Sequence, residues 1–270
     1  MARLFIFGAG YTAGRIAGAL RAGGWHVDAT GRAGNIAFDD EGAVRGALRT
    51  ATHILSSVPP DRDSGEDPVL GRYGEALETG ARWLGYLSST GVYGDTGGAW
   101  VDESAPVVGS GGSGRRSARA ECDSSWLARG ARVFRLPGIY GPGRSVLDRV
   151  REGRAHRIDL PDQVFSRVHV DDIVSGVLAA IECDAPPGAW NLADDLPCSQ
   201  NRLVEHACRL LGMPIPPLQT LEEADLSPMA RGFYAENRRV ANGKLKRAAN
   251  WAPLYPSYRE GLAALAKMRE

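Results

Sequence analysis

Short apolar runs alternate with segments of helical periodicity along the first half of the chain. Residues 3–7 (RLFIF) form a short apolar run, typical of a parallel strand covered on both faces. A helical pattern follows, with Ile16, Ala19 and Leu20 on one side and Gly23 as a stop signal. This alternation indicates an α/β fold with a Rossmann-type, doubly wound parallel sheet. It predicts strands at 25–30, 36–38, 53–58, 83–89 and 131–136, and helices from Asp39 or Asp40 to about Thr50, at 69–79 and at 116–129.

Beyond residue 140 the predicted segments become shorter and mixed. Ser227-Pro228 is a typical helix start, with Ser as the cap and Pro in the first turn. We expect a Rossmann domain over residues 1–140 and a small, mainly helical C-terminal mixed region over 141–270, with 167–195 returning in part to the first. The other predicted elements are helices at 146–152, 173–182 and 201–211, strands at 167–170 and 189–193, and a last helix containing Tyr258, Leu262 and Leu265.

The composition argues against several functional classes. The 270 residues include 32 Lys plus Arg and 32 Asp plus Glu, so no basic surplus favours nucleic acid or an anionic membrane as a partner. The four cysteines are scattered without a C-x-x-C pair or zinc-type His spacing, which predicts no metal site and suits a reducing cytoplasm. No stretch approaches the roughly 20 apolar residues that span a bilayer, so we expect a soluble, cytoplasmic protein.

A glycine motif follows the first predicted strand and opens a helix. Gly8, Gly10 and Ala13 match the dinucleotide pattern G-x-G-x-x-G/A. The first glycine allows a tight turn, the second lets a pyrophosphate approach the backbone, and the small third residue lets helix and strand pack closely. The helix N-terminus then offers N–H groups to the phosphates, with Tyr11 and Thr12 within reach. The motif therefore predicts that residues 1–140 bind a nicotinamide dinucleotide.

The end of the second predicted strand bears on the choice between NAD and NADP. A carboxylate there would bind both ribose hydroxyls of NAD, but Gly31 and Arg32 stand at the strand exit. Arg32 could pair with the 2′-phosphate of NADP, which makes NADP the preferred cofactor. In a competing interpretation Asp28 binds the ribose of NAD, because it lies about 20 residues after Gly8.

Four further motifs follow in order: YLSSTGVYG at 86–94, ESAP at 103–106, RLPGIYGPG at 135–143 and RVHVDDI at 167–173. Together with the glycine motif they resemble the extended short-chain dehydrogenase/reductase superfamily, the group of NAD-dependent epimerases and dehydratases that act on nucleotide sugars. The resemblance covers residues 3–195. It implies a small-molecule substrate, a nucleotide sugar or another carbonyl or carbinol compound, bound by the C-terminal region. GAGYTAG replaces the family's T-G-x-x-G-x-x-G, which marks an atypical member.

The resemblance also implies catalytic and cofactor-binding residues. Ser89 matches the family's catalytic Ser or Thr, and Thr90 stands beside it. The implied cofactor contacts are Asp39 at the adenine, Ser56, Ser57 and Val58 at the ribose and nicotinamide, Ser88 next to the catalytic serine, and Pro137 and Gly138 beside the nicotinamide.

Further candidates concern the substrate. Tyr93 and Tyr140 lie in glycine-flanked loops at strand ends, where ligands bind in open sheets, so Tyr93 is a candidate substrate contact and Tyr140 a candidate catalytic residue. Both could instead be packing aromatics. Arg167 and His169 fall where related enzymes approach the substrate, and Arg144 and Arg167 could hold a diphosphate. A structural role for His169 beside two aspartates is the alternative.

The family's Tyr-x-x-x-Lys pair is absent. Its expected positions hold Ser113 and Ser117, or Arg115 and Arg119 in another register, and no Tyr in the chain has a Lys four residues later. Arginine cannot replace the pair as a base, because it stays protonated. Another phenol, His169 or water would have to move the proton in a catalytic protein.

Three arginines form a further candidate ligand-binding group. Arg115, Arg116 and Arg119 follow a Gly/Ser loop and could clamp a phosphate or carboxylate, or form a solvated helix face.

One functional hypothesis is an NADP-dependent reductase, epimerase or dehydratase with a non-standard active site. The other is a non-catalytic NAD(P)-binding sensor or regulatory protein. Many relatives form homodimers through two flanking helices, for which 69–79 and 116–129 are the candidates.

Overall fold

The computed structural model describes residues 2–78, 81–108, 115–224, 226, 231, 234 and 236–268. Its centre is a six-stranded parallel sheet in the order β10-β6-β4-β3-β1-β2, which confirms the predicted Rossmann-type sheet. The order reverses beside β1, and ligands bind at the carboxyl ends of strands around such a switch point. The strands are β1 (Arg3–Phe7), β2 (His26–Ala29), β3 (His53–Ser56), β4 (Trp83–Ser89), β6 (Arg132–Leu136) and β10 (Gly188–Asn191).

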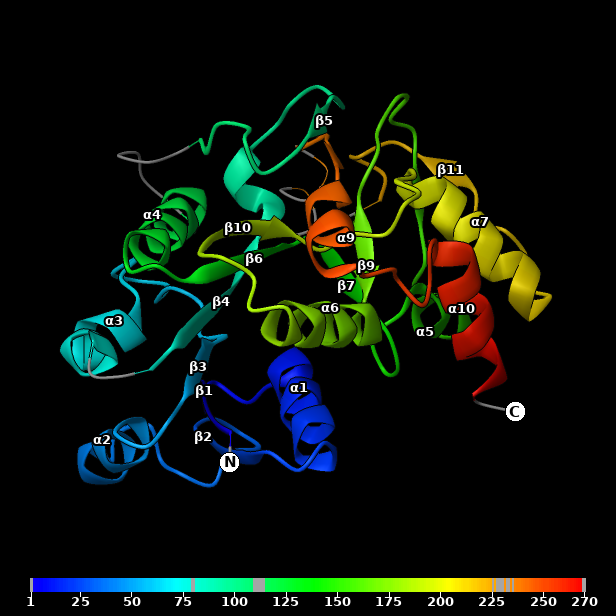
Figure 1. Cartoon of the computed structure of the whole chain (residues 1–270). Helices are drawn as coiled ribbons and strands as arrows, with labels where there is room; N and C mark the ends of the chain where they lie inside the picture. The colour runs from blue at the N-terminus through cyan, green and yellow to red at the C-terminus, as the bar shows by residue number, and fades with distance from the viewer. Residues whose placement is uncertain are drawn as a thin grey trace.

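Helices cover both faces of the sheet (Figure 1). In β1, Leu4 and Ile6 pack into one apolar cluster, whereas Phe5 and Phe7 pack into the other. Burial on both faces explains why this strand is a continuous apolar run in the sequence. The first cluster includes α1 (Tyr11–Ala22) and α6 (Val170–Glu182), and the second includes α2 (Glu41–Leu48), α3 (Pro68–Tyr73) and α4 (Arg115–Ala128).

The predicted strand at 36–38 is wrong. The N–H groups of Asn35 and Ile36 both donate to the carbonyl of Ala29, which folds this segment back onto the end of β2. Phe38 then packs edge-on against Phe7 and Tyr73. The apolar run therefore docks on the face covered by α2 and α3 and adds no strand. The predicted helix at 69–79 is divided between α3 and the 3₁₀ helix η1 (Gly74–Glu78).

The second half of the chain both completes the sheet and builds a separate apolar cluster. β10 joins the sheet and α6 packs on it, whereas α5 (Val146–Arg151), α7 (Gln200–Leu211) and α10 (Tyr258–Lys267) pack against one another. The sequence pattern did not predict β7 (Gly138–Tyr140), which pairs with β9 (Arg167–His169). Ser227-Pro228 lies outside the described residues. The remaining elements are η2 (Thr90–Tyr93), α9 (Gly243–Ala249), and the short strands β5 (Trp100–Val101), β8 (Arg157–Ile158), β11 (Leu218–Gln219) and β12 (Arg239–Val240).

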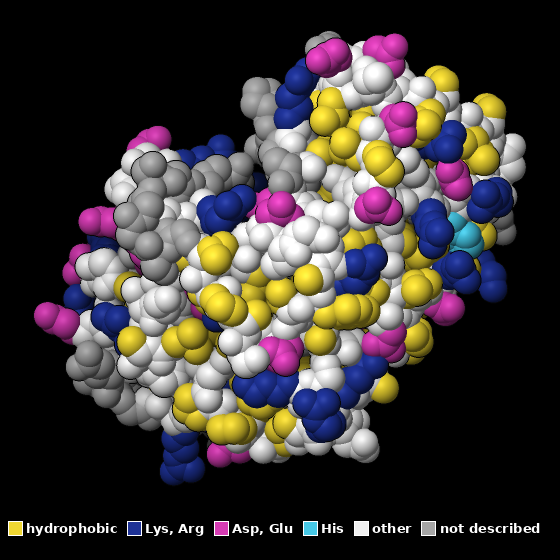
Figure 2. All heavy atoms as spheres, turned by 90° about the horizontal axis from the view of Figure 1, so that it is seen from above, with side chains coloured by type: hydrophobic (Ala, Val, Ile, Leu, Met, Phe, Trp, Pro, Cys, Tyr) yellow, Lys and Arg dark blue, Asp and Glu magenta, His cyan; other side chains and the backbone are white. Residues whose placement is uncertain are grey.

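Charges of both signs are interspersed on the face shown in Figure 2. Among the described residues, no helix combines the length and apolar character needed to cross a bilayer. The same residues contain no group of three or more His, Cys, Asp or Glu side chains placed to hold a metal ion.

A buried ion pair joins β6 to α4. Arg135 donates through Nε and Nη2 to both oxygens of Asp123, at 3.1 and 2.7 Å, and the two side chains are 3% and 0% exposed. The Ser88 hydroxyl donates to the same carboxylate at 2.6 Å. Arg135 also donates to the Tyr93 hydroxyl at 3.0 Å, and that hydroxyl donates to Asn191. The network thus joins β4, η2, β6, α4 and β10 next to the carboxyl edge of the sheet.

Replacing Asp123 tests how far the fold relies on this network. Asp123→Asn would leave the Arg135 cation buried without its charge partner, so we expect the free energy of unfolding to fall by about 3–5 kcal/mol. Urea denaturation followed by circular dichroism measures the loss. Asp184→Asn is the matched control, because Asp184 pairs with Arg132 but is 84% exposed. It should cost less than about 1 kcal/mol, and equal losses in the two variants would contradict this account.

Candidate functional site

The predicted glycine turn lies at the carboxyl ends of β1, β2 and β3. Gly8 has φ +83°, its N–H donates to Thr30 Oγ1 at 3.1 Å, and its carbonyl accepts from Ser57 Oγ at 2.5 Å. A Cβ at this position would come within 3.0 Å of Val58 Cγ2. Positive φ and close packing together explain why glycine is needed here. The structure thus brings the predicted cofactor residues Gly8, Ser57 and Val58 together.

Gly10 is constrained differently, because a Cβ there would meet only the Gly8 carbonyl oxygen, at 3.9 Å. Gly10 is the N-cap of α1, and no side chain caps this helix. The first N–H groups of α1, around Thr12 and the buried Ala13, are therefore left for another acceptor. An open backbone in front of an uncapped helix N-terminus fits a pyrophosphate group.

The residue before Arg32, Gly31, packs closely against the glycine turn. Gly31 has φ +97°, and a Cβ there would lie 2.8 Å from the Ala9 nitrogen, so the exit of β2 is pressed against the turn. Arg32 comes next and is exposed. Asp28, the competing ribose ligand, accepts from Asn35 at 2.8 Å and lies 2.9 Å from His26 Nε2. These contacts tie Asp28 to its own strand and the following turn, whereas Arg32 stays available beside the turn.

Two other predicted cofactor contacts differ in exposure. Ser56 ends β3 and is fully buried, with its hydroxyl accepting from the Val58 N–H at 3.4 Å. Asp39 is exposed just before the N-cap of α2, and its carbonyl accepts from Arg72 Nη2 at 3.3 Å.

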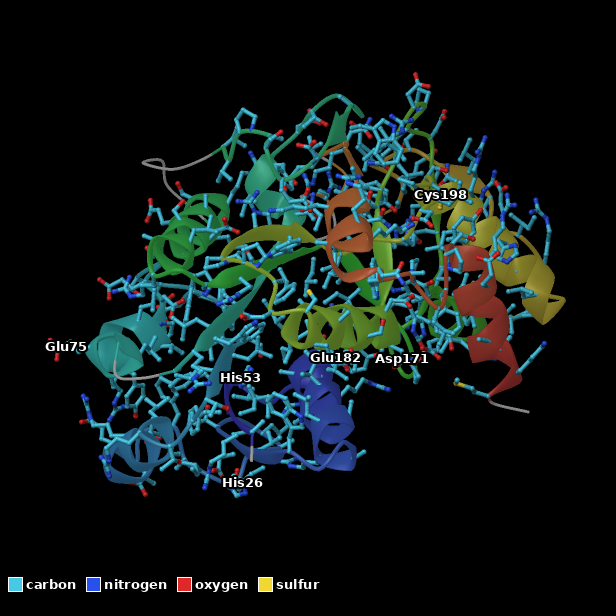
Figure 3. All side chains as sticks on the ribbon, viewed as in Figure 1. His26, His53, Glu75, Asp171, Glu182 and Cys198 are labelled. Carbon is cyan, nitrogen blue, oxygen red and sulfur yellow. The ribbon has the colours of Figure 1, made fainter. Side chains whose placement is uncertain are left out.

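Tyr11 and Arg144 form a group at the start of α1. The Tyr11 hydroxyl donates to the Pro142 carbonyl at 3.1 Å, and the Arg144 guanidinium lies 5.8 Å from the centre of the Tyr11 ring. Arg15, one turn along α1, pairs at 3.3 Å with Asp171 of α6, which Figure 3 labels. Arg144, a predicted substrate contact, therefore lies near the dinucleotide turn.

A small pocket of about 80 Å³ opens where β4 and β6 end. Thr90, Pro137 and Gly138 line it, so predicted catalytic and nicotinamide-binding residues meet there. Ser89 stands at the end of β4, next to Thr90, and accepts from the Gly91 N–H at 3.1 Å. The other lining residues are Phe165, Ser166, Glu236, Arg238 and Val240.

Ser88, Ser89 and Tyr93 are not among the residues that line this pocket, and Ser88 and Tyr93 are held in other contacts. Ser88 is 6% exposed and donates to Asp123, on the α4 side of β4. Tyr93 is 2% exposed and its hydroxyl is held by Asn191 and Arg135. Burial raises the pKa of Tyr93 above its ordinary value, more than the neighbouring Arg135 lowers it. Both hydroxyls therefore serve the buried network described above.

Tyr140, Arg167 and His169 also point into the protein. Tyr140 is buried in the cluster of α5, α7 and α10, where burial raises its pKa strongly. The Arg167 guanidinium donates to the carbonyls of Phe165 and Cys198 and to Gln200 Oε1. His169 is fully buried and caps α6 by accepting from the Asp171 N–H at 3.2 Å. Burial lowers the pKa of His169, so the neutral ring fits this capping role. Tyr140 thus lies where a packing aromatic would, and His169 has a structural role as a helix cap.

The positions expected for the Tyr-x-x-x-Lys pair hold serines or arginines, which do not supply the acid/base group of the pair. Ser117 lies on α4 and is 4% exposed. Ser113 and the side chain of Arg115 lie outside the described part of the chain. Arg116 stands one residue before Ser117, and its guanidinium forms an ion pair with Glu236.

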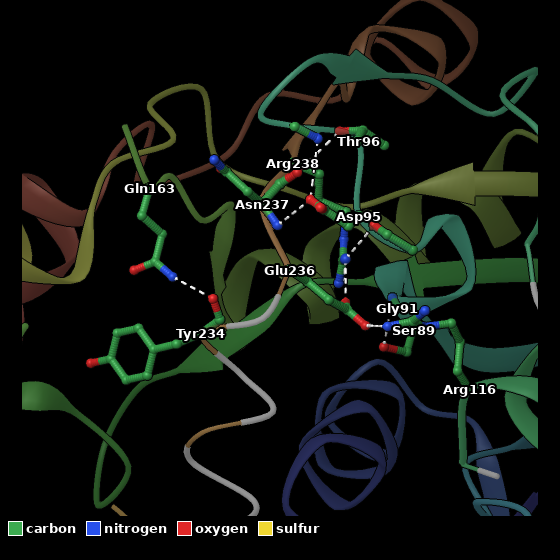
Figure 4. A network of polar contacts seen from close by, with 12 residues as sticks. Ser89, Gly91, Asp95, Thr96, Arg116, Gln163, Tyr234, Glu236, Asn237 and Arg238 are labelled. Atoms are coloured by element: carbon green, nitrogen blue, oxygen red, sulfur yellow. Dashed lines mark hydrogen bonds and ion pairs between the residues drawn. The ribbon is translucent and has the colours of Figure 1, made fainter. Parts of the chain in front are cut away.

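Glu236 and Arg238 are pocket residues that the sequence analysis missed. They line the pocket from a segment far along the chain and form an ion pair with each other (Figure 4). No local motif marks them, because their place in the pocket depends on non-local contacts such as the pairing of β12 with β5.

The parallel sheet with the glycine turn at its switch point is the fold of the extended short-chain dehydrogenases/reductases, which solved epimerase and dehydratase structures share. A solved structure of a functionally unknown conserved protein from Silicibacter pomeroyi DSS is 39% identical, covers all of both chains and has a TM-score of 0.86. The chain belongs to the same family as that protein. No protein-family model matches the chain.

Two relatives with named activities share less with the chain. A 3-diazoavenalumate denitrifying reductase from a Streptomyces species is 34% identical over 144 residues, which are 48% of this chain and 45% of the reductase. The match thus spans less than half of that curated relative. The structure of dTDP-glucose 4,6-dehydratase from Bacillus anthracis, in complex with NAD, has a TM-score of 0.78 at 16% identity and covers 99% of this chain and 96% of that one. At this identity, the likeness to the dehydratase shows a shared fold alone.

Proposed function

We propose that this protein is an NADP(H)-dependent oxidoreductase of the short-chain dehydrogenase/reductase type that acts on a small carbonyl or carbinol compound. The observation that carries the proposal is that an uncapped helix N-terminus behind a glycine turn shares one sheet edge with a pocket lined by Thr90, Pro137 and Gly138. Cofactors and substrates of open α/β sheets bind at this edge. The activities named for the Streptomyces reductase and the B. anthracis dehydratase support the same class of reaction.

The chain's own residues would bind and orient the reactants. When bound, a nicotinamide dinucleotide supplies or accepts the hydride. The first N–H groups of α1 would hold the pyrophosphate, and Arg32 would pair with the 2′-phosphate. Pro137 and Gly138 would flank the nicotinamide, and Ser89 would donate a hydrogen bond to the substrate oxygen as charge develops there.

The proton would reach the substrate by a different route from that in the family. Tyr93, Tyr140 and His169 are buried in contacts of their own, and the neighbouring arginines stay protonated. We therefore assign the proton to water at the pocket opening. A reaction in which hydride transfer comes first and solvent then delivers the proton suits such a site.

Gly10 provides a test that separates cofactor binding from folding. Gly10→Val places a side chain in open space at φ −98°, which any residue adopts, so the melting temperature should be unchanged. The same side chain would block the pyrophosphate, and NADPH affinity measured by calorimetry should fall roughly 100-fold or more. Gly18→Val, on the exposed side of α1, is the control and should leave the affinity unaltered. Full affinity in Gly10→Val would remove the basis of the proposal.

Arg32 tests the choice of cofactor. Arg32→Gln removes the partner of the 2′-phosphate, so the Kd for NADPH should rise roughly 10- to 100-fold while the Kd for NADH stays the same. Arg209→Gln, an exposed arginine on α7, is the control and should change neither constant. Parallel weakening of both nucleotides would show that Arg32 does not read the 2′-phosphate.

Turnover decides between an enzyme and a sensor. NADPH oxidation followed at 340 nm with a panel of ketones, aldehydes and keto-sugars should exceed background, and Ser89→Ala should lower kcat on the order of 10²-fold. The buried Ser117 at the family's lysine position favours the alternative, a protein that binds NADP(H) and regulates a partner. That alternative predicts tight binding, no turnover with any compound, and a partner whose capture depends on NADP⁺ or NADPH.

A further inference from the structure

The pocket contains a carboxylate held between two arginines. Glu236 forms an ion pair through Oε1 with Arg116 of α4 and through Oε2 with Arg238. Figure 4 shows the Glu236 side chain extending toward Ser89, Gly91 and Arg116, at the end of β4. Both oxygens of one carboxylate are thus bound by two guanidinium groups beside the residue proposed to orient the substrate oxygen.

The backbone that carries this group is fixed at three points around Asn237. The Asn237 N–H donates to Asp95 at 2.9 Å, and its carbonyl accepts from the N–H groups of Thr96 and Gly98 at 3.1 and 2.9 Å. Its side-chain oxygen accepts from the Val164 N–H at 2.9 Å. Glu236 and Arg238 flank this anchored residue, so their Cα positions are set independently of the ion pairs that their side chains form.

Two arginines face the Glu236 carboxylate in this cluster. Arg116 and Arg238 carry two positive charges and Glu236 carries one negative charge. Asp95 is a second carboxylate whose charge interacts with Arg238, and its Oδ1 accepts from the N–H groups of Asn237 and Gly97. Arg238 also donates to the Gly94 carbonyl at 2.7 Å, which fixes the direction of its guanidinium group. The two guanidinium groups are thus oriented toward one position, which a single small carboxylate fills.

The exposure of the three side chains bears on whether Glu236 could leave the two arginines. Its side chain is 19% exposed, that of Arg238 is 17% exposed and that of Arg116 is 47% exposed, so the cluster borders solvent. A glutamate side chain can rotate away while its anchored backbone stays in position. The guanidinium groups would then be left for a ligand.

We propose that Arg116 and Arg238 bind the carboxylate of a small-molecule substrate, and that Glu236 occupies this position when no substrate is bound. The group now bound is itself a carboxylate, and planar guanidinium groups pair with carboxylates through oriented, charge-assisted hydrogen bonds. The inference rests on the proposed function for the identity of the ligand as substrate. It adds that the substrate is an organic acid.

Calorimetry with benzoate and cinnamate, each compared with its amide, tests this inference on protein with and without NADP⁺. The wild type should bind the acids at least about tenfold more tightly than the amides. Glu236→Gln removes the competing anion, so acid affinity should rise about tenfold, whereas Arg238→Gln should lower it about tenfold or more. Glu205→Gln is the matched control: Glu205 is also held between two arginines, Arg157 and Arg209, but does not line the pocket. It should leave acid binding unaltered.

Three outcomes would overturn the inference: equal affinity for acids and amides, weaker acid binding in Glu236→Gln, or tighter binding of phenyl phosphate than of benzoate. If Arg238→Gln does not fold, Arg116→Gln gives the same measurement from an exposed side chain. Acid binding without NADPH binding would support carboxylate binding by Arg116 and Arg238 and would reject the proposed function. NADPH binding and turnover of neutral ketones without selective acid binding would do the reverse.

Discussion

The backbone of Gly8 is the contact on which the geometry of the site depends. Its N–H is bound by Thr30 beyond β2, and its carbonyl is bound by Ser57 beyond β3, so one residue after β1 joins three strand ends. The positive φ, and Val58 Cγ2 at only 3.0 Å from where a Cβ would stand, both favour glycine at this position. Since β3, β4 and β6 continue the same parallel sheet, the glycine turn and the pocket lie along one edge of it.

Local pattern was sufficient to predict the elements that are buried on both faces. β1 and β4 are apolar runs because both sides of each strand meet helices, and the glycine motif carries its own geometric reason. The failure at 36–38 has an equally physical cause. An apolar run shows that a segment is buried, but the capture of two N–H groups by the Ala29 carbonyl, which keeps this segment out of the sheet, depends on tertiary folding. β7 was missed because strand pairing with β9 is a non-local contact that periodicity does not encode.

For the site, residue type was more predictable than side-chain direction. Ser88 and Ser89 are neighbours on β4, so their side chains leave opposite faces of the sheet. Ser88 turns to Asp123 under α4, and Ser89 remains at the strand end beside the pocket. The motif marked Ser89 as catalytic and Ser88 as a cofactor contact, but it did not show the direction of either side chain. Glu236 could not be predicted for a different reason. It lines the pocket because the completed fold brings its segment there, and no residue next to it in the sequence marks this.

The role of α4 explains why the usual acid/base pair can be absent without loss of the fold. This helix contributes Asp123 to the buried ion pair, and Trp126, whose indole N–H donates to Asp67 at 2.7 Å. Its inner face is thus committed to stability, and Ser117 is buried with it. Among the described side chains of α4, Arg116 at the edge of that face pairs with Glu236, which lines the pocket. The helix on which the family pattern expects Tyr and Lys thus holds Asp123 and Trp126 in the core and sets a guanidinium group against a carboxylate that lines the pocket.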